Sequence, residues 1–367
     1  MTAGSNDTAK KYNNIKLTGG IIKSFTTFIL IGLFVALGLS KSLYNIITTV
    51  TQNEYLIFIL FVLISGLVSS VLFFPANYYL EYYLEHKYSL SNQTFIKWIW
   101  EDLKESLVGL VIGIPIMLLF FFTLNKFGAN WWLPFSILLF VVSVLLAKIV
   151  PVVILPLFYK ITPLEDEELK TRILRLSGDV GMKVENVYSF DMSKNTKKAN
   201  AAFTGLGSTK RILLGDTLIK NFTLNEIETV IAHELGHYKK KHIIKNIFIG
   251  ALFSFLTFFL IAKLYDLSLS WFGFQVRTEI AALPLLVLWG MVIGVVQMPI
   301  SNMISRKFEY EADNYAVSAT GKKEDFLATL SKLTEQNLAD KEPHPLVEWF
   351  FYSHPSIARR AGFIRDL

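Results

Sequence analysis

Residues 230–242 read VIAHELGHYKKKH, and the apolar run 243–265 follows directly. The segment contains the pattern H-E-x-x-H, and positions four apart lie on the same face of a helix. His233 and His237 can therefore bind one Zn²⁺, with Glu234 placed to act on a water molecule. Because the 367 residues include only six histidines, the pattern is specific. The stretch predicts a zinc site within about one helical turn of a membrane surface.

The distribution of apolar residues predicts the fold class. Hydrophobic residues make up 52% of the chain, only slightly more than the roughly 45–50% of a soluble domain. They cluster, however, in six runs, and each is long enough for a bilayer core, which needs about 20 helical residues. The runs are 22–40, 54–76, 107–125, 131–158, 243–265 and 281–304. We expect a mainly α, polytopic membrane protein, with a kink in the fourth run at Pro151 or Pro156.

Composition also excludes several classes of protein. The chain has no cysteine, which excludes disulfides and thiolate zinc ligands. The net charge of +6 does not indicate nucleic-acid binding, because the basic residues follow the membrane topology. Six crossings put both termini on one side, together with nearly all Lys and Arg, and the positive-inside rule makes this side cytoplasmic.

The expected organisation follows from these runs. It comprises a polar N-terminal segment 1–20, transmembrane helices 1–4 in 21–158 with a cytoplasmic loop at 77–106, a catalytic segment 159–242, transmembrane helices 5 and 6 in 243–304, and a C-terminal catalytic segment 305–367. Within 159–242, a strand at 186–190 and a hairpin around the Gly-rich stretch 205–207 are expected. The hairpin could offer an edge strand to a peptide substrate or could be purely structural. Thr223 and Glu226 predict a capping box at the start of the zinc helix.

The third zinc ligand should be a carboxylate or a histidine from elsewhere in the chain. Glu309 and Asp313 are four residues apart at the end of the sixth run, so one can bind the metal while the other orients a ligand imidazole. Glu311 lies on a different face, about 200° away. The alternative for this cluster is a solvated acidic helix end. His242 lies five residues beyond His237, off the ligand face of a continuous helix, and is expected to be an interfacial residue and not a ligand.

Several separate motifs resemble the integral-membrane zinc metalloproteases related to CAAX prenyl protease 1 and, more distantly, the HtpX-like membrane proteases. The resemblance covers approximately residues 50–367. The motifs are HELGH at 233–237, FEYEAD at 308–313, ANAAF at 199–203, KRILLGDTL at 210–218, PLFYKITPL at 156–164, SNQT at 91–94 and YSHPS at 352–356.

The resemblance implies a gluzincin-type domain with a small β-sheet and a chamber enclosed by the membrane helices. It implies that His233, His237 and Glu309 ligate one Zn²⁺ and that Glu234 is the general base. The other implied site residues are Asp313, which would hold a ligand histidine, His354, which would face the reacting carbonyl, and Asn200, Ala201 and Arg360, which would contact the substrate. Family members typically have seven spans and six are predicted here, so the chamber could be open where the first span is absent. Residues 195–197 also depart from the Ser/His-containing segment of the prenyl proteases.

The predicted function is a zinc metalloendopeptidase that cleaves near the C-terminus of prenylated C-a-a-X proteins, in contact with membrane lipid. Two alternatives stay open: a membrane protease that removes misfolded membrane proteins, and a transporter or channel with a zinc site, to which Lys148 in an apolar run would fit. An inactive zinc-binding relative is disfavoured because all the catalytic residue types are present. The C-terminus lacks an endoplasmic-reticulum retrieval signal, which favours a bacterial cytoplasmic membrane over an endoplasmic-reticulum membrane.

Overall fold

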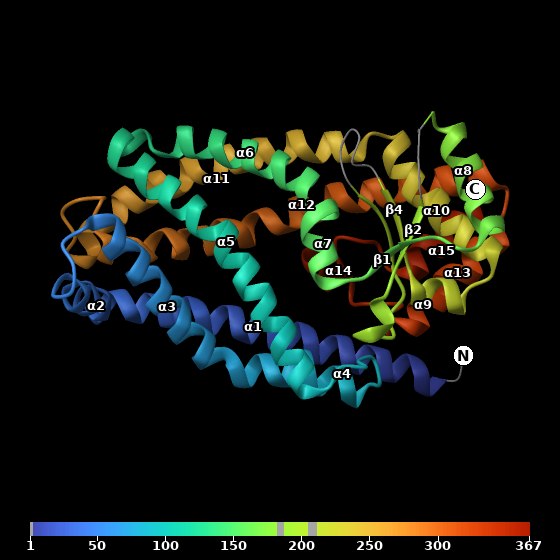
Figure 1. Ribbon diagram of the computed structural model, residues 1–367, viewed down its shortest axis with the longest axis horizontal. Coiled ribbons are helices and arrows are strands. Elements are labelled where there is room, and N and C mark those ends of the chain that lie inside the picture. The colour runs from blue at the N-terminus through green and yellow to red at the C-terminus, as the bar shows by residue number, and fades with distance from the viewer. Residues whose placement is uncertain (1–2, 182–186, 205–210) are drawn as a thin grey trace.

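A computed structural model describes residues 3–181, 187–204 and 211–367. Long helices form most of the molecule, and a small sheet with shorter helices lies at one end (Figure 1). Both chain termini lie at the end that holds the sheet (Figure 1).

Six helices in the described part of the chain are long and apolar enough to cross a membrane. They are built on α1 (Ala3–Ala36), α3 (Glu54–Asn77), α5 (Phe95–Phe127), α6 (Trp132–Ile149), α11 (His242–Ser268) and α12 (Pro284–Thr320). The short α2 (Leu39–Thr48) joins the first two. The predicted mainly α membrane architecture is therefore confirmed.

The six spans form a closed ring of neighbouring helices, the arrangement expected to enclose a chamber. Each span contacts the next in the order α1, α3, α5, α6, α11, α12, and α12 contacts α1 again. The accessible surface is 19180 Å², whereas a compact protein of 41.8 kDa exposes about 14,900 Å². Seen down the axis of α12, its exposed apolar side chains cover about 200° of the helix circumference, from the direction of Met298 round to that of Ile300. The outward face of a helix in a ring would account for a narrower arc. The contact between α1 and α12 completes this ring of neighbouring spans.

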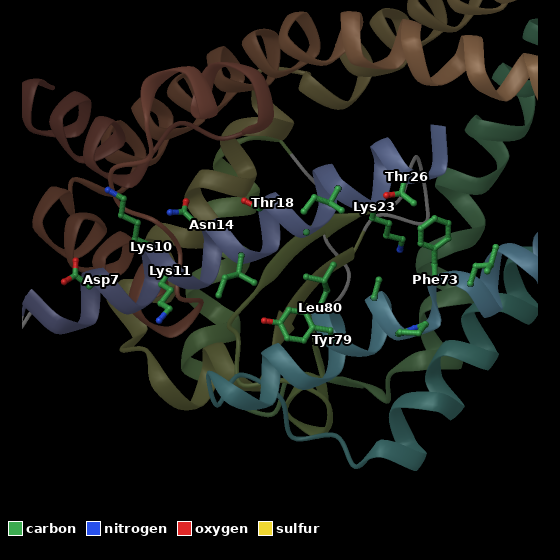
Figure 2. Close-up of a pocket in the computed structure, with 16 residues that line it drawn as sticks. Asp7, Lys10, Lys11, Asn14, Thr18, Lys23, Thr26, Phe73, Tyr79 and Leu80 are labelled. Carbon is green, nitrogen blue, oxygen red and sulfur yellow. The ribbon is translucent and has the colours of Figure 1, made fainter. Parts of the chain in front are cut away.

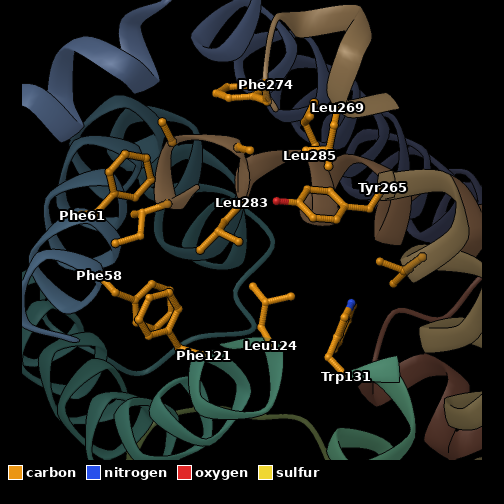
Figure 3. Packing of buried hydrophobic residues seen from close by; sticks show 14 of the residues in the cluster. Phe58, Phe61, Phe121, Leu124, Trp131, Tyr265, Leu269, Phe274, Leu283 and Leu285 are labelled. Carbon is orange, nitrogen blue, oxygen red and sulfur yellow. The ribbon is translucent and has the colours of Figure 1, made fainter. Parts of the chain in front are cut away.

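An apolar cluster seals the end of the ring away from the sheet (Figure 3). Phe58 of α3 and Phe121 of α5 stack with their ring centroids 4.6 Å apart. Trp131, which is 1% exposed, lies beside them at the start of α6. Tyr265 of α11 is fully buried, and its hydroxyl donates to the carbonyl of Arg277 at 2.8 Å. Burial of these large rings stabilises the closed end.

The sequence predicts a separate polar segment at residues 1–20, and the structure differs. From Ala3 onward these residues form the first part of α1. The hydroxyl of Tyr12 donates to Glu85 Oε1 at 2.6 Å, and Lys16 Nζ forms an ion pair with the same carboxylate at 2.8 Å. Since these polar side chains pair with a neighbouring helix, α1 continues beyond its apolar part, which hydropathy alone cannot predict.

The expected loop at 77–106 is also mostly helical. A π-helical turn η1 (Tyr78–Tyr83) and α4 (Leu84–Lys87) extend α3, and only 88–94 separate them from α5. These residues pair with the segment 193–197, where the Asn92 N–H donates to the Asn195 carbonyl at 3.0 Å. In the fourth span, α6 ends at Ile149 and passes through a π-helical turn η3 (Val150–Ile154) into α7 (Leu155–Phe158), which confirms the predicted interruption.

A four-stranded sheet precedes the zinc motif in the chain. Its strands are β1 (Ile161–Pro163), β2 (Val187–Phe190), β3 (Ala201–Thr204) and β4 (Arg211–Gly215), in the order β1-β2-β4-β3. β3 and β4 pair antiparallel, as expected for the predicted hairpin, and β2 pairs with β4 in parallel. β3 is therefore an edge strand of the described sheet. Asn186 and the Gly-rich stretch of the predicted hairpin lie outside the described residues.

Helices surround the sheet and bury a second apolar core. They are α8 (Glu167–Asp179), α9 (Asp216–Asn221), α10 (Leu224–Lys239), α13 (Lys323–Gln336), α14 (Pro345–Phe351) and α15 (Ile357–Asp366). From α10, the side chains of Ile227, Ile231 and Leu235 are at most 1% exposed in this core. A Cβ on Gly236 would lie 2.9 Å from the Cα of Ala312, so the glycine allows α10 and α12 to approach at backbone distance.

Candidate metal centre

A capping box fixes the start of α10, as predicted. Thr223 Oγ1 accepts the Glu226 N–H, and Glu226 Oε2 accepts the Thr223 N–H at 2.7 Å. The helix carries His233 and His237 on one face, one turn apart. The close crossing at Gly236 then brings this face against α12, which carries Glu309.

His233, His237 and Glu309 form a cluster of three potential metal ligands. The Nε2 atoms of His233 and His237 lie 3.2 Å apart. His233 Nε2 lies 3.4 Å from Glu309 Oε2, and His237 Nε2 lies 3.4 Å from Glu309 Oε1. Donor atoms at about 2.05 Å from a tetrahedral Zn²⁺ are about 3.3 Å apart, so the observed spacings fit this ion.

The polar atoms at this point also fit a cation because they lack other partners. Glu309 Oε2 is buried and accepts no well-aligned hydrogen bond from the described residues. His354 Nδ1 lies 3.0 Å from that oxygen, but not in hydrogen-bond alignment. Two imidazole nitrogens that face one another need either a shared proton or a cation between them. One buried carboxylate and two imidazoles are the donor set of a catalytic zinc site.

Asp313 and Arg360 lie behind His233. Asp313 is fully buried, and its Oδ1 lies 2.8 Å from His233 Nδ1. Arg360 donates through Nε to Asp313 Oδ2 at 2.8 Å. Burial lowers the pKa of His233, but hydrogen bonds with Asp313 and Glu309 outweigh it and raise this pKa to about 9 in the metal-free protein. The pair of Asp313 and Arg360 therefore favours a proton on Nδ1 and leaves Nε2 facing the ligand cluster.

Arg360 is placed differently from the expected substrate contact. Its side chain is buried, and two of its nitrogens are engaged by Asp313. The third nitrogen, Nη1, lies 3.7 Å from Glu309 Oε2. The geometry thus favours a residue that positions Asp313, and any contact with substrate would involve Nη1 alone.

His242 is a site residue that the sequence analysis missed. It is 1% exposed, and its Nδ1 lies 2.9 Å from His237 Nδ1. Its Nε2 lies 3.0 Å from Glu311 Oε2, and its ring stacks on Phe308 at 4.1 Å. Since His237 faces the ligand cluster through Nε2, its Nδ1 carries the proton and donates to His242. His242 then donates from Nε2 to Glu311, so one chain of hydrogen bonds orients the second ligand imidazole.

A break between two helices explains why this residue was missed. The expectation for His242 extended one helix past His237, but α10 ends at Lys239 and α11 begins at His242. Lys241 between them has φ of +58°, in the left-handed region. The reversal turns His242 back toward His237. The usable signal was the run of three lysines, which marks the end of α10.

His354 lies on the loop between α14 and α15 and is largely exposed, beside Glu309. Arg306, one turn before Glu309 on α12, donates to the carbonyls of Glu348 and Tyr352 at 3.0 and 2.6 Å. These bonds satisfy carbonyl groups at the end of α14 and hold the loop against the helix that carries Glu309. The expected site histidine is therefore next to the ligand cluster.

The remaining predicted residues lie on α10 and at the edge of the sheet. Glu234 follows His233 and is half-buried. Asn200 is exposed immediately before β3, and its carbonyl accepts the Gly215 N–H at 2.9 Å. Ala201 is half-buried in β3. The positions of Asn200 and Ala201 at an edge strand allow contact with an extended peptide.

Comparisons with known proteins cover nearly all of the chain. Residues 163–367 match peptidase family M48, and residues 1–160 match the CAAX prenyl protease N-terminal region, described as five membrane helices. Four of the six candidate spans of the described chain lie in that second region. The metalloprotease YhfN of Bacillus subtilis is 32% identical over 96% of this chain and 83% of its own length. The CAAX prenyl protease 1 of Saccharomyces cerevisiae is 33% identical over 86% of this chain and 73% of its own.

The crystal structure of Ste24p from S. mikatae superposes with a TM-score of 0.90 at 29% identity. The match covers 99% of this chain and 90% of that chain. The resemblance thus extends over the N-terminal 50 residues, which the motifs alone did not reach. The chain belongs to peptidase family M48, among the membrane metalloproteases related to CAAX prenyl protease 1.

Proposed function

We propose that this protein is a zinc-dependent endopeptidase that cleaves a peptide bond near the C-terminus of prenylated C-a-a-X-type proteins. The observation that carries the proposal is the ligand cluster of His233, His237 and Glu309, with spacings of 3.2–3.4 Å, at the sheet end of a ring of membrane helices. The edge strand β3 lies in the same domain and leaves one side free among the described strands.

The chain's own residues supply the proton transfers. When bound, Zn²⁺ contributes Lewis acidity that makes water a nucleophile near neutral pH and polarises the scissile carbonyl. Glu234 accepts the proton of the attacking water and returns it to the leaving amine. His354 donates a hydrogen bond to the developing negative oxygen, an effect worth about 3–4 kcal/mol in comparable sites. The main chain of the substrate pairs with β3 beside Asn200 and Ala201.

The chamber explains why such a site is built into a membrane. Moving an isoprenoid from lipid into water costs about 0.8 kcal/mol per CH₂. The ring offers an apolar interior that can hold the lipid while the peptide reaches the metal centre. Both termini and α10, which carries the two histidines, lie at one end of the molecule (Figure 1), and this arrangement together with the positive-inside rule supports a cytoplasmic active site.

The variant Glu234→Gln tests the reaction. It should retain stoichiometric zinc and an unchanged melting temperature but lose hydrolysis, because the amide cannot accept the water proton. Peptide hydrolysis retained in this variant would refute the role of Glu234.

Lipid dependence tests the substrate class. A farnesylated C-a-a-X peptide and its unmodified version, compared in detergent with and without a chelator, should differ strongly in kcat/KM. Equal cleavage of both peptides would instead favour a protease that removes damaged membrane proteins with loose sequence preference.

A further inference from the structure

A groove with a volume of about 970 Å³ lies between α1 and the α3–η1 helix (Figure 2). It is far from the metal ligands in the chain, and none of the ligand or second-layer residues described above lines it. At its middle the two helices are in close contact, since a Cβ on Gly19 would lie 2.6 Å from Leu80 Cδ2. The groove therefore has a narrow floor and opens along one side of α1.

Most groove residues of α1 lie away from the face by which this helix pairs with its neighbours. Successive helical residues turn by 100°, which places Tyr12, Lys16 and Lys23 on one face of α1. This face makes the contacts with Glu85, Leu80 and Asn77. The groove residues Lys11, Thr18 and Ile22 point about 120° away from it and are exposed.

One end of the groove is polar and positively charged. Lys10 and Lys11 are exposed, and neither has a carboxylate within 4 Å among the described residues. Asn14 and Thr18 line the same end and add hydrogen-bonding groups, and Asp7 is the only acidic residue of the lining. The labelled side chains of Figure 2 show this polar end of α1.

The other end is apolar. Ile22 of α1 is 60% exposed and Leu72 of α3 is 59% exposed, and both line the groove beside Phe73. About 16 Å of helix separates Lys11 from Ile22. This is the distance over which α1 passes from its polar part into its apolar run, so the groove extends from headgroup depth into the hydrocarbon.

We propose that this groove binds an anionic glycerophospholipid of the membrane. Its phosphate lies between Lys10 and Lys11, with Asn14 and Thr18 as neighbours, and an acyl chain lies across Ile22, Leu72 and Phe73. Two lysines with no carboxylate within 4 Å in the described part of the chain, beside an apolar cleft, match the charge and the length of such a lipid. A zwitterionic lipid has the same chains but carries no net charge for the lysines to attract.

Bound lipid stabilises the ring through α1. This helix joins α3 to α12, and its polar inner face holds Glu85 and the carbonyl of Leu338. Near the middle of the groove, α1 packs against the α3–η1 helix through Gly19 and Leu80. A lipid that contacts both helices would add to this packing from the groove side. A lipid that binds only the folded state raises the melting temperature, and the increase grows with the logarithm of the free lipid concentration once that concentration exceeds the Kd.

The experiment uses the full-length protein in a neutral detergent. Phosphatidylglycerol and phosphatidylcholine with identical chains are titrated, bound lipid is counted by native mass spectrometry, and the melting temperature is recorded. The wild type should bind phosphatidylglycerol in preference and melt at a higher temperature with it. Lys10→Ser/Lys11→Ser should weaken that binding about 30-fold, since each lysine near an anionic headgroup contributes a factor of about five.

The matched control is Lys239→Ser/Lys240→Ser, which removes the same charge from an exposed pair at the end of α10. It should keep the preference for phosphatidylglycerol. The proposal is overturned if the groove variant keeps the wild-type preference, or if the control pair loses it equally, since the effect would then be one of net charge. Self-association of lipid-free protein that is lost in the groove variant would also overturn it in favour of a second copy.

Discussion

The two imidazoles of the candidate metal centre are oriented by different partners. His233 donates to a carboxylate that Arg360 holds, whereas His237 donates to the neutral ring of His242. The hydrogen bonds that start at His237 pass through His242, the first residue of α11, and end on Glu311 of α12. The geometry of His237 therefore depends on a membrane helix.

Replacing His242 tests this dependence. His242→Leu removes the acceptor for His237 Nδ1 and should weaken zinc binding about 10–100-fold, as for other residues that orient a ligand histidine. His242→Gln retains an acceptor and should recover part of the affinity. Competition with a chelator of known affinity measures both.

The control is Lys245→Ser, which alters the surroundings of Glu311 but leaves His242 in place. It should change zinc affinity less than twofold. Equal affinities in the wild type and His242→Leu would show that His237 needs no such partner.

At the scale of elements, the crossing of α10 and α12 sets the distance between the histidines and Glu309. Gly236 permits this crossing, because an added Cβ would meet backbone atoms of Ala312 at 2.9 and 3.0 Å. Gly236→Ala should therefore separate the helices, lower stability by about 1–3 kcal/mol and reduce zinc content. Melting curves and elemental analysis measure the two effects.

Gly250 in α11 provides the matched glycine, since nothing lies within 4 Å of its added Cβ. Gly250→Ala should leave zinc content unchanged and not lower stability. If Gly236→Ala also kept full zinc and stability, the close crossing would have no role in the site.

Glu228 joins three elements, and its charge makes the joint dependent on pH. It is 2% exposed on α10, and it pairs with Lys322 before α13 and with Arg172 on α8. Burial raises the pKa of Glu228, but the hydrogen bond from Lys322 and the contacts with Arg172 outweigh it, so this pKa falls below 4.5. A lowered folded-state pKa contributes stability that is present above about 4.5 and is lost as the pH falls through the folded value.

Glu228→Gln should therefore lower stability at pH 7 by about 2 kcal/mol. The difference from the wild type should shrink as the pH falls below about 4.5. Melting temperatures of both proteins across this range measure the effect. A difference that stays constant with pH would mean that the Glu228 charge is not responsible.

The elements that the sequence predicts well are those whose signals are local. The six spans, the interruption by Pro151 and the capping box at Thr223 each depend on neighbouring residues. The N-terminal part of α1 was missed because it is stabilised by the distant contact of Tyr12 with Glu85. The helices within 77–106 were missed for the same reason, since a polar composition does not distinguish a loop from a helix that extends beyond the membrane.

The site shows the same division. The spacing of His233 and His237, and of Glu309 and Asp313, is enough to predict which side chains share a helical face. It cannot predict that Arg360 is buried against Asp313, or that a left-handed Lys241 returns His242 to the site. Both depend on how α15 and α11 pack.

At the scale of the whole molecule, one end of the ring is sealed and the other holds the metal centre. The apolar cluster around Trp131 and Tyr265 closes the far end, and the α1–α12 contact completes the ring of spans.

The most direct test is the metal content of the full-length protein. Elemental analysis of folded, purified protein should find one zinc per chain, and X-ray absorption should show only nitrogen and oxygen ligands at about 2.0–2.2 Å. Glu309→Gln should weaken that binding and His233→Ala/His237→Ala should abolish it, with the fold retained. Protein that folds with no bound metal, or that keeps its zinc when both histidines are replaced, would contradict the account.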